Sequence, residues 1–360
     1  MNMTIMHKGA EGIDHERVVI RQDPETGMRL IVAVHSTVLG PALGGMRLRA
    51  YPGDLPEALD DVLALARTMT LKASAAGLDL GGGKAVMLDD GCAQTRDARM
   101  LAAARAIHEL GGAYITAEDI GTTTADMDLM SRHTRWVVGR SEENGGRGDP
   151  SPMTAETVVR AIERGLQAAT GSPDLDGRVV GVIGLGKVGV PLARKLAARG
   201  AHVLACDIDS QRVATLAGEG VVEAAGSGED LLRRELDVLA PCAAGGSVDE
   251  HVACRVVCGA ANNPLASPAV AASLASRGVL YVPDFLANCG GLISVAAEWT
   301  RAGDADVEAH IATAMHRLGD ALDEARRTGE PPAAVAERHA LDRVETAREA
   351  RRARGLAAVA

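Results

Sequence analysis

The sequence predicts an α/β protein of two domains, in which an N-terminal α/β domain precedes a doubly wound parallel sheet. The chain has 360 residues, which is too long for one ordinary core and suits two domains. Its second half alternates short apolar strands with helical segments, the pattern of parallel strands joined by crossover helices. A polar stretch rich in glycine, proline and serine at 141–152 is the clearest domain boundary.

The first domain is expected to combine a hairpin with several helices. Residues 18–36 alternate apolar stretches around Pro24 and Gly27, which predicts a β-hairpin. The segment at 40–53 is too rich in glycine for regular structure. Helical periodicity then covers 54–72, with Asp54 as the expected N-cap and Pro56 in the first turn. The remaining elements are a helix at about 95–111, a strand and loop at 114–121, and a short helix at 124–133.

The second domain is expected to be a regular alternation. Helices are predicted at 154–170, 187–199, 210–218 and 267–276, and strands at 178–184, 202–207, 236–242, 254–260 and 278–284. The last part of the chain is helical. We place the domains at 1–147 and 148–330, with C-terminal helices at 331–360 packing back on the first domain and a cleft between the domains.

Composition excludes several classes of function. Hydrophobic residues make up 47% and charged residues 24% of the chain, as in soluble globular proteins. The net charge of −10 disfavours nucleic acid as a partner, and the arginines near the C-terminus fit a solvated helix face. No apolar run suits a membrane span or a signal peptide, so we expect a cytoplasmic protein. The 6 cysteines form no CxxC pair, which favours reduced thiols and no metal site, including at Cys254 and Cys258.

A glycine motif predicts a dinucleotide-binding turn of the Rossmann type. The apolar strand at 179–183 runs into Gly184-Leu185-Gly186-Lys187-Val188-Gly189, and a helix follows. The first glycine permits the tight turn, the second lets a pyrophosphate approach the backbone, and the third lets helix and strand pack closely. The phosphates would lie at the helix N-terminus, where free N–H groups and the helix dipole favour anions. The alternative is a turn that only joins a strand to a helix.

Asp207 indicates which dinucleotide binds. It ends the next strand, at close to the usual distance after Gly184. A carboxylate there accepts hydrogen bonds from a ribose 2′-hydroxyl and repels a 2′-phosphate, which predicts NAD. Arg212, a few residues further on, leaves an opening for NADP. Because this unit starts after residue 175, the first domain is expected to supply substrate binding and chemistry.

Two lysines in the first domain lie in apolar surroundings of small residues. Lys72 falls in the segment MTLKASAAG, and Lys84 follows three glycines. Desolvation and a second ammonium nearby both favour the neutral form of an amine, which is a good general base. A charged lysine beside it would hold a carboxylate. The alternatives are a glycine-rich loop that binds phosphate and a plain surface loop.

Further polar candidates stand at strand ends, where α/β proteins collect functional groups. Asp119 precedes a threonine-rich loop, and Glu118 beside it is equally suited by composition. Asn262 and Asn263 follow a buried strand of the second domain. Their amides fit contacts to a cofactor or substrate, or a simple Asx turn.

Eight motifs in order along the chain are together far more specific than the glycine motif alone. They are GPALGGMR at 40–47, MTLKASAAGLDLGGGKAV at 69–86, TAEDIGTT at 116–123, GDPSPMTA at 148–155, GLGKVG at 184–189, APCAAGG at 240–246, GAANNPLA at 259–266 and PDFLANCGGLISVA at 283–296. From about residue 18 to about 345, the chain resembles the glutamate/leucine/phenylalanine/valine dehydrogenase family, and most closely its leucine and valine members.

The resemblance implies a role for each matching residue. Lys84 is implied as the general base that activates water, Lys72 as the binder of the substrate carboxylate and Asp119, by motif position, as the acid near the amino group. Asn262 would contact both cofactor and substrate. The substrate side chain would be lined by Leu43, Gly44, Ala117, Leu292 and Val295. The implied cofactor positions are Arg47, Thr154, Gly184, Leu185, Gly186, Lys187, Val188, Gly189, Asp207, Cys242 and Ala243.

The implied reaction is the reversible, NAD-dependent oxidative deamination of an L-amino acid to a 2-oxo acid, ammonia and NADH. Leu43 stands where the glutamate enzymes of the family have a lysine, and Val295 replaces a hydroxyl residue. A second substrate carboxylate would therefore be buried without a partner, which favours leucine, valine or isoleucine as the substrate. One methylene separates leucine from valine, too little for the sequence to choose between them. Met46, Ala73 and Cys289 depart from the family pattern, and the first two are expected near the substrate.

Three alternative functions share parts of this pattern. They are a phenylalanine dehydrogenase of the same family, a non-catalytic NAD-binding sensor on this fold, and a dehydrogenase of the hydroxyacid or opine type. Retention of Lys72, Lys84 and Asp119 speaks against the sensor, and no strand-end histidine supports the last type. We expect small-molecule partners, no nucleic acid or membrane, and a homo-oligomer.

Overall fold

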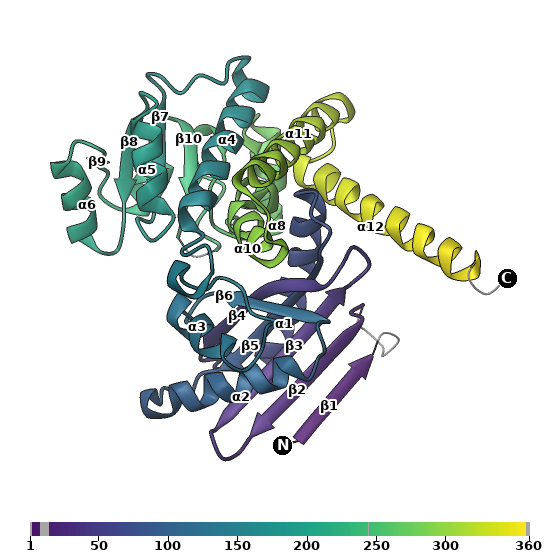
Figure 1. The fold of residues 1–360 in the computed structure, drawn as a ribbon. Helices are drawn as coiled ribbons and strands as arrows, with labels where there is room; N and C mark the ends of the chain where they lie inside the picture. The colour runs from purple at the N-terminus through teal and green to yellow at the C-terminus, as the bar shows by residue number, and fades with distance from the viewer. Residues whose placement is uncertain (1, 8–13, 244, 358–360) are drawn as a thin grey trace. The chain divides into compact units, whose positions relative to one another are not determined.

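The computed structural model describes residues 2–7, 14–243 and 245–357 and divides into two compact units (Figure 1). Unit 1 contains the residues up to Pro150, Leu292–Val307 and those from Ala340 on, and unit 2 contains Ser151–Gly291 and Glu308–His339. The segment Leu292–Val307 therefore belongs with the N-terminal half, whereas the sequence placed it with the second domain.

The sheet of unit 1 has six strands in the order β1-β2-β3-β5-β4-β6. β1 (Asn2–His7), β2 (Arg17–Asp23), β3 (Met28–Ser36) and β5 (Gly81–Leu88) are antiparallel neighbours. β4 (Ala42–Arg49) runs parallel to β5 and to β6 (Tyr114–Glu118). The pairing of β2 with β3 confirms the predicted hairpin.

The prediction of irregular structure at 40–53 was wrong, because β4 lies inside the sheet between β5 and β6. Its glycines permit a close approach of neighbouring chains rather than a loop. A Cβ atom on Gly44 would lie 1.8 Å from the Gly83 carbonyl oxygen, and one on Gly45 would lie 2.8 Å from Asp119 Cβ. The three glycines before Lys84 likewise begin β5, so the expected alternatives of a phosphate-binding or surface loop are also wrong.

Helices cover both faces of this sheet. α1 (Asp54–Ala75) packs over Ile31 and Val86 on one face. α2 (Arg96–His108) and α3 (Thr124–Ser131), which follow the short 3₁₀ turn Ala93–Thr95, pack over Met46 and Met87 on the other. Met46 and Ala85 belong to the core under α2 and α3. Because side chains alternate along a strand, their neighbours Arg47 and Lys84 face α1.

The start of α1 differs from the prediction. Gly53, not Asp54, is its N-cap, and the Gly53 N–H donates to Glu57 Oε2 at 2.7 Å. Asp54 is already the first helical residue and has a φ of 51°. The Glu57 side chain thus binds the N–H of the cap residue, and Gly53 itself supplies no side-chain cap to the first turn.

Each of the three C-terminal helices contributes residues to both units. α10 (Gly290–Thr300), α11 (Asp304–Thr328) and α12 (Pro332–Ala357) each have residues in both. Within unit 1, Ser74 Oγ donates to the Ala340 carbonyl at 2.7 Å, and Arg343 pairs with Asp79 at 2.8 Å. The segment from Ala340 on is therefore held against the end of α1. Along the described residues, no helix combines the length and apolarity needed to cross a bilayer.

Unit 2 is a parallel sheet of six strands in the order β12-β11-β10-β7-β8-β9. The strands are β7 (Val179–Ile183), β8 (His202–Cys206), β9 (Glu223–Ala224), β10 (Leu236–Pro241), β11 (Cys254–Val257) and β12 (Leu280–Tyr281). The strand order reverses beside β7, as in the doubly wound dinucleotide-binding fold. The predicted parallel sheet is thus confirmed.

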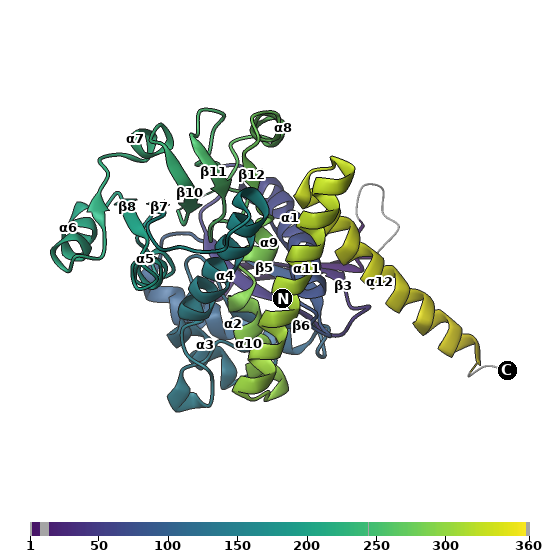
Figure 2. The same cartoon turned by 90° about the horizontal axis from the view of Figure 1, so that it is seen from above.

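Helices lie on both faces of this second sheet (Figure 2). α4 (Ser151–Thr170) and α5 (Gly189–Ala197) cover one face, and α7 (Gly228–Leu232) and α8 (Pro268–Ser276) cover the other. α6 (Ser210–Gly218) packs beside β9, and α9 (Asp284–Ala287) leads into α10. Leu204, Leu239 and Leu274 are part of the apolar core between the sheet and α8.

Candidate active site

A buried cluster of charges lies on three adjacent strands of unit 1. Lys84 projects from β5, Arg47 from β4, and Asp119 follows β6. Lys84 Nζ lies 2.8 Å from Asp119 Oδ2, and Arg47 Nε donates to the same oxygen at 3.0 Å. Lys84 is 5% and Arg47 8% exposed. The fold thus brings together two residues assigned to the chemistry and one assigned to the cofactor.

The surroundings of Asp119 determine its protonation state. Burial alone would raise the pKa of its carboxyl, but the charges and hydrogen bonds of Lys84 and Arg47 outweigh burial and lower the pKa to about 2. Asp119 is therefore ionised near neutral pH. A carboxylate in this state accepts a proton first, and it acts as an acid only after it has taken that proton up.

Arg47 is held by a second carboxylate that the sequence analysis missed. Its Nη1 donates to Asp61 Oδ2 at 2.9 Å, and the Tyr51 hydroxyl donates to the same oxygen at 2.6 Å. Burial and the hydrogen bond to Asp61 raise the pKa of Tyr51, which keeps it a neutral donor. Asp61 stands in the polar part of an amphipathic helix, so only its contact with β4 distinguishes it from a solvated residue.

The loop after β6 is fastened so that Asp119 faces the cations. The Asp119 N–H donates to Thr122 Oγ1 at 2.8 Å, and the Thr122 hydroxyl donates to the Met46 carbonyl at 2.9 Å. Glu118, the alternative acid, accepts a hydrogen bond from Thr124 Oγ1 at 3.0 Å. Thr122 of the TAEDIGTT motif and Thr124 directly after it therefore orient this pair of acids.

Lys72 approaches the same face of the sheet from the helix. It lies near the end of α1, which packs over β5, and it is 8% exposed. Ala73 beside it is fully buried. The buried Lys72 ammonium on α1 is suited to hold an anion between α1 and β5, which carries Lys84. The role of Lys72 as the binder of the substrate carboxylate remains a prediction.

Several residues predicted to line the substrate side chain are neighbours within unit 1. A Cβ atom on Gly139 would lie 3.8 Å from Val295 Cγ1 and 3.9 Å from Ala117 Cβ, so the chain at Gly139 passes between β6 and α10. Leu43 and Leu292 are buried, and Leu43 pairs with Gly82 of β5, next to Gly44. Sequence reasoning missed Gly139, because a glycine in an irregular segment gives no local signal of what it faces.

Met46 does not lie with these residues. It belongs to the core that α2 and α3 form on the opposite face of the sheet, so the expectation that it stands near the substrate was wrong. Side chains alternate along β4, so Met46 must face α2 and α3 because the next residue, Arg47, faces α1.

Glu298, also missed from the sequence, fixes the position of Gly139. Its carboxylate accepts the Gly139 N–H at 2.9 Å and Arg140 Nε at 2.8 Å, and its side chain is 2% exposed. Leu292, Val295 and Glu298 lie on successive turns of α10, so the helix is anchored beside two of the residues predicted to line the substrate side chain.

In unit 2, the glycine turn has the geometry that a pyrophosphate needs. Gly184 has a φ of 96°, and a Cβ atom on Gly189 would lie 1.9 Å from the Gly184 carbonyl oxygen. A Cβ atom on Gly186 would meet no atom within 4 Å, so the backbone is open there. The residues of this turn therefore fit a bound dinucleotide.

The other predicted cofactor positions of unit 2 lie around its strand ends. The Cys242 N–H donates to the Ile183 carbonyl at 2.7 Å, and Ala243 N lies 2.9 Å from where a Gly184 Cβ would be. Burial raises the pKa of the Cys242 thiol to about 12, so it stays neutral. Lys187 and Val188 complete the turn before α5, and Thr154 lies in the first turn of α4.

Asp207 reaches back to the glycine turn. Its Oδ2 accepts the Leu185 N–H at 2.5 Å, and its Oδ1 accepts the Asp209 N–H at 2.8 Å. Arg212 lies 3.2 Å from Asp209 Oδ2. The Asp207 carboxylate has further lone pairs for a ribose hydroxyl, so Asp207 can bind the Leu185 N–H and still fit the ribose of NAD.

Asn262, the predicted contact to cofactor and substrate, is held by a side chain of the same unit. Its Oδ1 accepts a hydrogen bond from Asn288 Nδ2 at 2.8 Å.

Known proteins resemble this chain over nearly its full length. The family model described as Glu/Leu/Phe/Val dehydrogenase, dimerisation domain, matches residues 15–136, and the one described as Glutamate/Leucine/Phenylalanine/Valine dehydrogenase matches 208–352. The valine dehydrogenase of Streptomyces albus is 42% identical over 354 residues, which are 97% of this chain and 96% of that protein. The leucine dehydrogenase of Geobacillus stearothermophilus is 39% identical over 350 residues, 96% of this chain and 95% of that protein.

The fold is also that of a solved structure, the L-tryptophan dehydrogenase from Nostoc punctiforme. The two superpose with a TM-score of 0.79 at 30% identity, over 93% of this chain and 97% of the other. The chain therefore belongs to the glutamate/leucine/phenylalanine/valine dehydrogenase family, as its motifs indicated.

Proposed function

We propose that this amino-acid dehydrogenase catalyses the reversible, NAD-dependent oxidative deamination of an aliphatic branched-chain L-amino acid. The products are the 2-oxo acid, ammonia and NADH. The observation that carries the proposal is the buried contact of Lys84 with Asp119 on a face that also carries apolar Leu43. Similarity to valine and leucine dehydrogenases over nearly the full chain supports the same substrate class.

The proposed roles follow from charge and burial. Lys72 holds the substrate carboxylate as a buried cation. Asp119, ionised in the free enzyme, accepts a proton from the substrate ammonium. NAD, when bound, would supply the acceptor for the hydride of the substrate Cα. Lys84, once it has given up its own proton, removes a proton from the water that adds to the imino carbon. Asp119 then returns its proton to the nitrogen, and ammonia leaves as the carbonyl forms and the hydroxyl proton passes to solvent.

The substrate class rests on an apolar pocket. Leu43, Ala117, Leu292 and Val295 are buried and carry no charge. A γ-carboxylate next to Leu43 would be desolvated without a cation, at a cost of several kcal/mol. Leucine, valine or isoleucine loses only apolar contact with water there, which is favourable. Glutamate is therefore expected to be a poor substrate.

The cofactor is proposed to bind unit 2 through Gly184, Leu185, Gly186, Lys187, Val188 and Gly189, with Asp207 on the ribose. Cys242, Ala243, Thr154 and Asn262 complete this set, and Arg47 is the position proposed from unit 1. In this scheme residues 1–147 and the segment Leu292–Val307 form the substrate domain, and the rest of 148–330 forms the NAD-binding domain.

Two further properties complete the proposal. The 6 cysteines are all free, which suits the reducing cytoplasm. The match of residues 15–136 to a model described as a dimerisation domain supports assembly into a homo-oligomer.

The test is NADH formation, followed by its absorbance, with purified protein and a panel of L-leucine, L-valine, L-isoleucine, L-phenylalanine and L-glutamate. Rates led by the three aliphatic substrates with NAD⁺ would support the proposal and rank leucine against valine. Rates led by phenylalanine would contradict the proposed substrate class. Absence of turnover with every substrate, although NAD⁺ binds, would favour the sensor.

A further inference from the structure

Asp61 is a charged residue of unit 1 to which the proposed reaction assigns no role. It lies on α1, and its side chain is about three-quarters buried. Arg47 Nη1 lies 3.2 Å from Asp61 Oδ1 and 2.9 Å from Asp61 Oδ2, and the Tyr51 hydroxyl donates to Oδ2 at 2.6 Å. Two donors therefore fix this carboxylate beside the buried cluster of Lys84 and Asp119.

Arg47 joins the carboxylate of Asp61 to the one that the reaction uses. Its Nε donates to Asp119 Oδ2 at 3.0 Å, while its Nη1 donates to Asp61. The guanidinium group is planar and rigid, so a partner bound to one nitrogen fixes the direction in which the other nitrogens point. Asp61 thus acts on Asp119 through Arg47.

The charges of this cluster balance one another. Lys84 and Arg47 are its cations, and Asp61 and Asp119 are its anions. Without Asp61, both cations would act on the single carboxylate of Asp119, and the cluster would carry excess positive charge. Lys84 and Arg47 are almost fully buried, so water would screen this excess only weakly.

The balance matters because the substrate brings a charge of each sign into the site. In the proposed reaction Lys72 holds the substrate carboxylate, and Asp119 receives the substrate ammonium. Excess positive charge around Asp119 would repel the ammonium, but it would not repel a ligand that carries only the carboxylate. The charge of Asp61 is therefore expected to affect the amino group in particular.

We propose that Asp61 is a positioning residue for the amino group of the substrate. It neutralises and orients Arg47, and so leaves the Asp119 carboxylate able to attract the substrate ammonium and to accept its proton. This inference rests on the proposed function, because the ammonium enters the site as part of that reaction.

Two ligands with the same side chain measure this effect. L-leucine carries the amino group, and 4-methylpentanoate is the same molecule without it; L-valine and 3-methylbutanoate form the corresponding pair if valine is the better substrate. The KM of the amino acid and the competitive inhibition constant of its analogue are measured with the full-length enzyme and saturating NAD⁺. The inhibition constant divided by the KM, which we call the ligand ratio, reports the amino group, because the other contacts are shared.

Asp61→Asn keeps the shape of the side chain and removes its charge. The ligand ratio is expected to fall about ten-fold, with the amino acid bound more weakly and the analogue bound at least as tightly as before. Asp61→Glu restores the charge and should restore most of the ratio. Asp60→Asn, the same change at the neighbouring exposed residue of α1, is the matched control and should leave the ratio unchanged. An unchanged ratio in Asp61→Asn would overturn the proposal.

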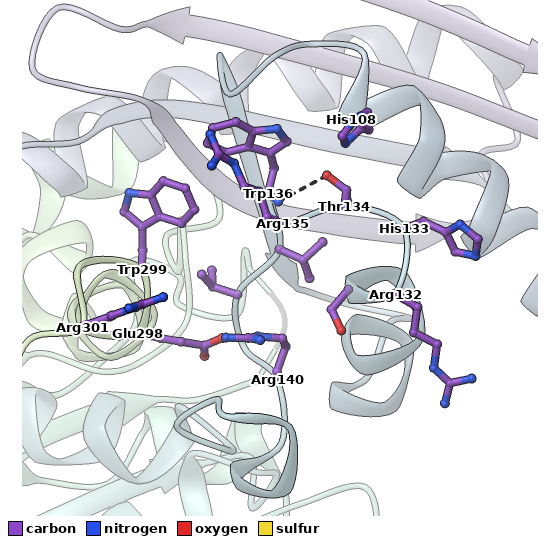
Figure 3. Close-up of a pocket in the computed structure, with 13 residues that line it drawn as sticks. His108, Arg132, His133, Thr134, Arg135, Trp136, Arg140, Glu298, Trp299 and Arg301 are labelled. Atoms are coloured by element: carbon purple, nitrogen blue, oxygen red, sulfur yellow. Dashed lines mark hydrogen bonds and ion pairs between the residues drawn. The ribbon is translucent and has the colours of Figure 1, made fainter.

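Glu298→Gln is the control for the loss of a buried carboxylate that binds an arginine. Glu298 pairs with Arg140 at 2.8 Å, and both residues line a cavity of about 700 Å³ that Trp136 and Trp299 also line (Figure 3). Glu298 supports residues beside the predicted side-chain pocket, which the two ligands fill alike. The variant should therefore weaken both ligands in parallel and keep the ratio. An equal fall of the ratio in Glu298→Gln and Asp61→Asn would overturn the proposal.

A reciprocal pair of variants tests the same balance if Asp61→Asn does not fold. Arg47→Gln leaves two carboxylates with one lysine, so the ligand ratio should rise. Asp61→Asn added to Arg47→Gln removes the excess negative charge and should bring the ratio back towards the native value. A ratio that does not respond to this addition would overturn the proposal.

Failure of the inference is distinguishable from failure of the proposed function. If the native protein forms no NADH from any aliphatic amino acid, the proposed function is contradicted and this inference with it. If the enzyme is active and its ligand ratio does not depend on Asp61, only this inference is overturned.

Discussion

Lys84 and Asp119 form one charge-coupled pair, with the lysine Nζ 2.8 Å from Asp119 Oδ2, although Lys84 lies on β5 and Asp119 directly follows β6. Arg47 shares the same carboxylate oxygen, and Asp61 holds Arg47 in turn. Because the cluster is buried, removal of any one charge leaves the remaining charges only partly compensated. The catalytic groups and their supports therefore behave as a unit.

Replacement of the proposed base should abolish turnover without abolishing cofactor binding. Lys84→Ala is expected to lower kcat for the best substrate by about 10²–10⁴-fold, the usual contribution of a general base. NAD⁺ binding, measured by calorimetry, should change little, because Lys84 lies in unit 1 and the glycine turn in unit 2. Lys195→Ala, at a lysine paired with Glu156 in unit 2, is the control. A near-normal rate in Lys84→Ala would rule out the mechanism.

The charge of Asp119 should make stability depend on acid pH. Its pKa is lowered from 3.8 to about 2 in the folded protein, so the stabilisation is complete above the unfolded value and is lost as the pH falls from about 4 towards 2. The shift corresponds to about 2 kcal/mol. Tm values of the native protein and Asp119→Asn should differ most at pH 5–7, and the gap should narrow below about pH 4. A gap that is constant across this range would contradict the assignment.

Asp207 should determine the preference for NAD over NADP. Asp207→Ser removes the negative charge that repels a 2′-phosphate but keeps one acceptor for the Leu185 N–H. The ratio of kcat/KM with NAD⁺ to that with NADP⁺ is expected to fall at least about ten-fold, the equivalent of one charged hydrogen bond. Adding Arg212→Gln to this variant should reduce the NADP⁺ activity again. An unchanged cofactor ratio in Asp207→Ser would show that another group selects the cofactor.

Gly139 should set the depth of the side-chain pocket. In Gly139→Ala the added methyl group points between Ala117 and Val295. We expect kcat/KM to fall more for leucine than for valine, by about ten-fold in the ratio, since one methylene is worth about that much in an apolar pocket.

Gly145→Ala is the matched control for this change, because Gly145 has a φ of 77° against 76° at Gly139 and open space around its Cβ position. Both variants should lose about 1 kcal/mol of stability from the strained backbone, but only Gly139→Ala should change the substrate ratio. The same change in both variants would assign the effect to strain alone.

Local patterns were sufficient for the fold of unit 2. The alternation of strands and helices gave the doubly wound sheet, and the glycine motif was correctly placed between β7 and α5. The same kind of reasoning failed for β4, whose glycines suggested a loop. Glycine has low strand propensity, and only the closeness of β5 and the Asp119 loop explains why no larger residue fits.

The sequence by itself determined the class of fold, the dinucleotide motif, the family and the residues that carry the proposed chemistry. These are properties of short segments, in which the order of residue types specifies backbone conformation and chemical function together. The tertiary structure alone decided that Arg47 joins Asp119 to Asp61, that Gly139 borders Ala117 and Val295, and that both tryptophans line one cavity. Each of these contacts joins residues far apart in the chain, and their meeting depends on strand order and helix packing, which no local window of sequence contains.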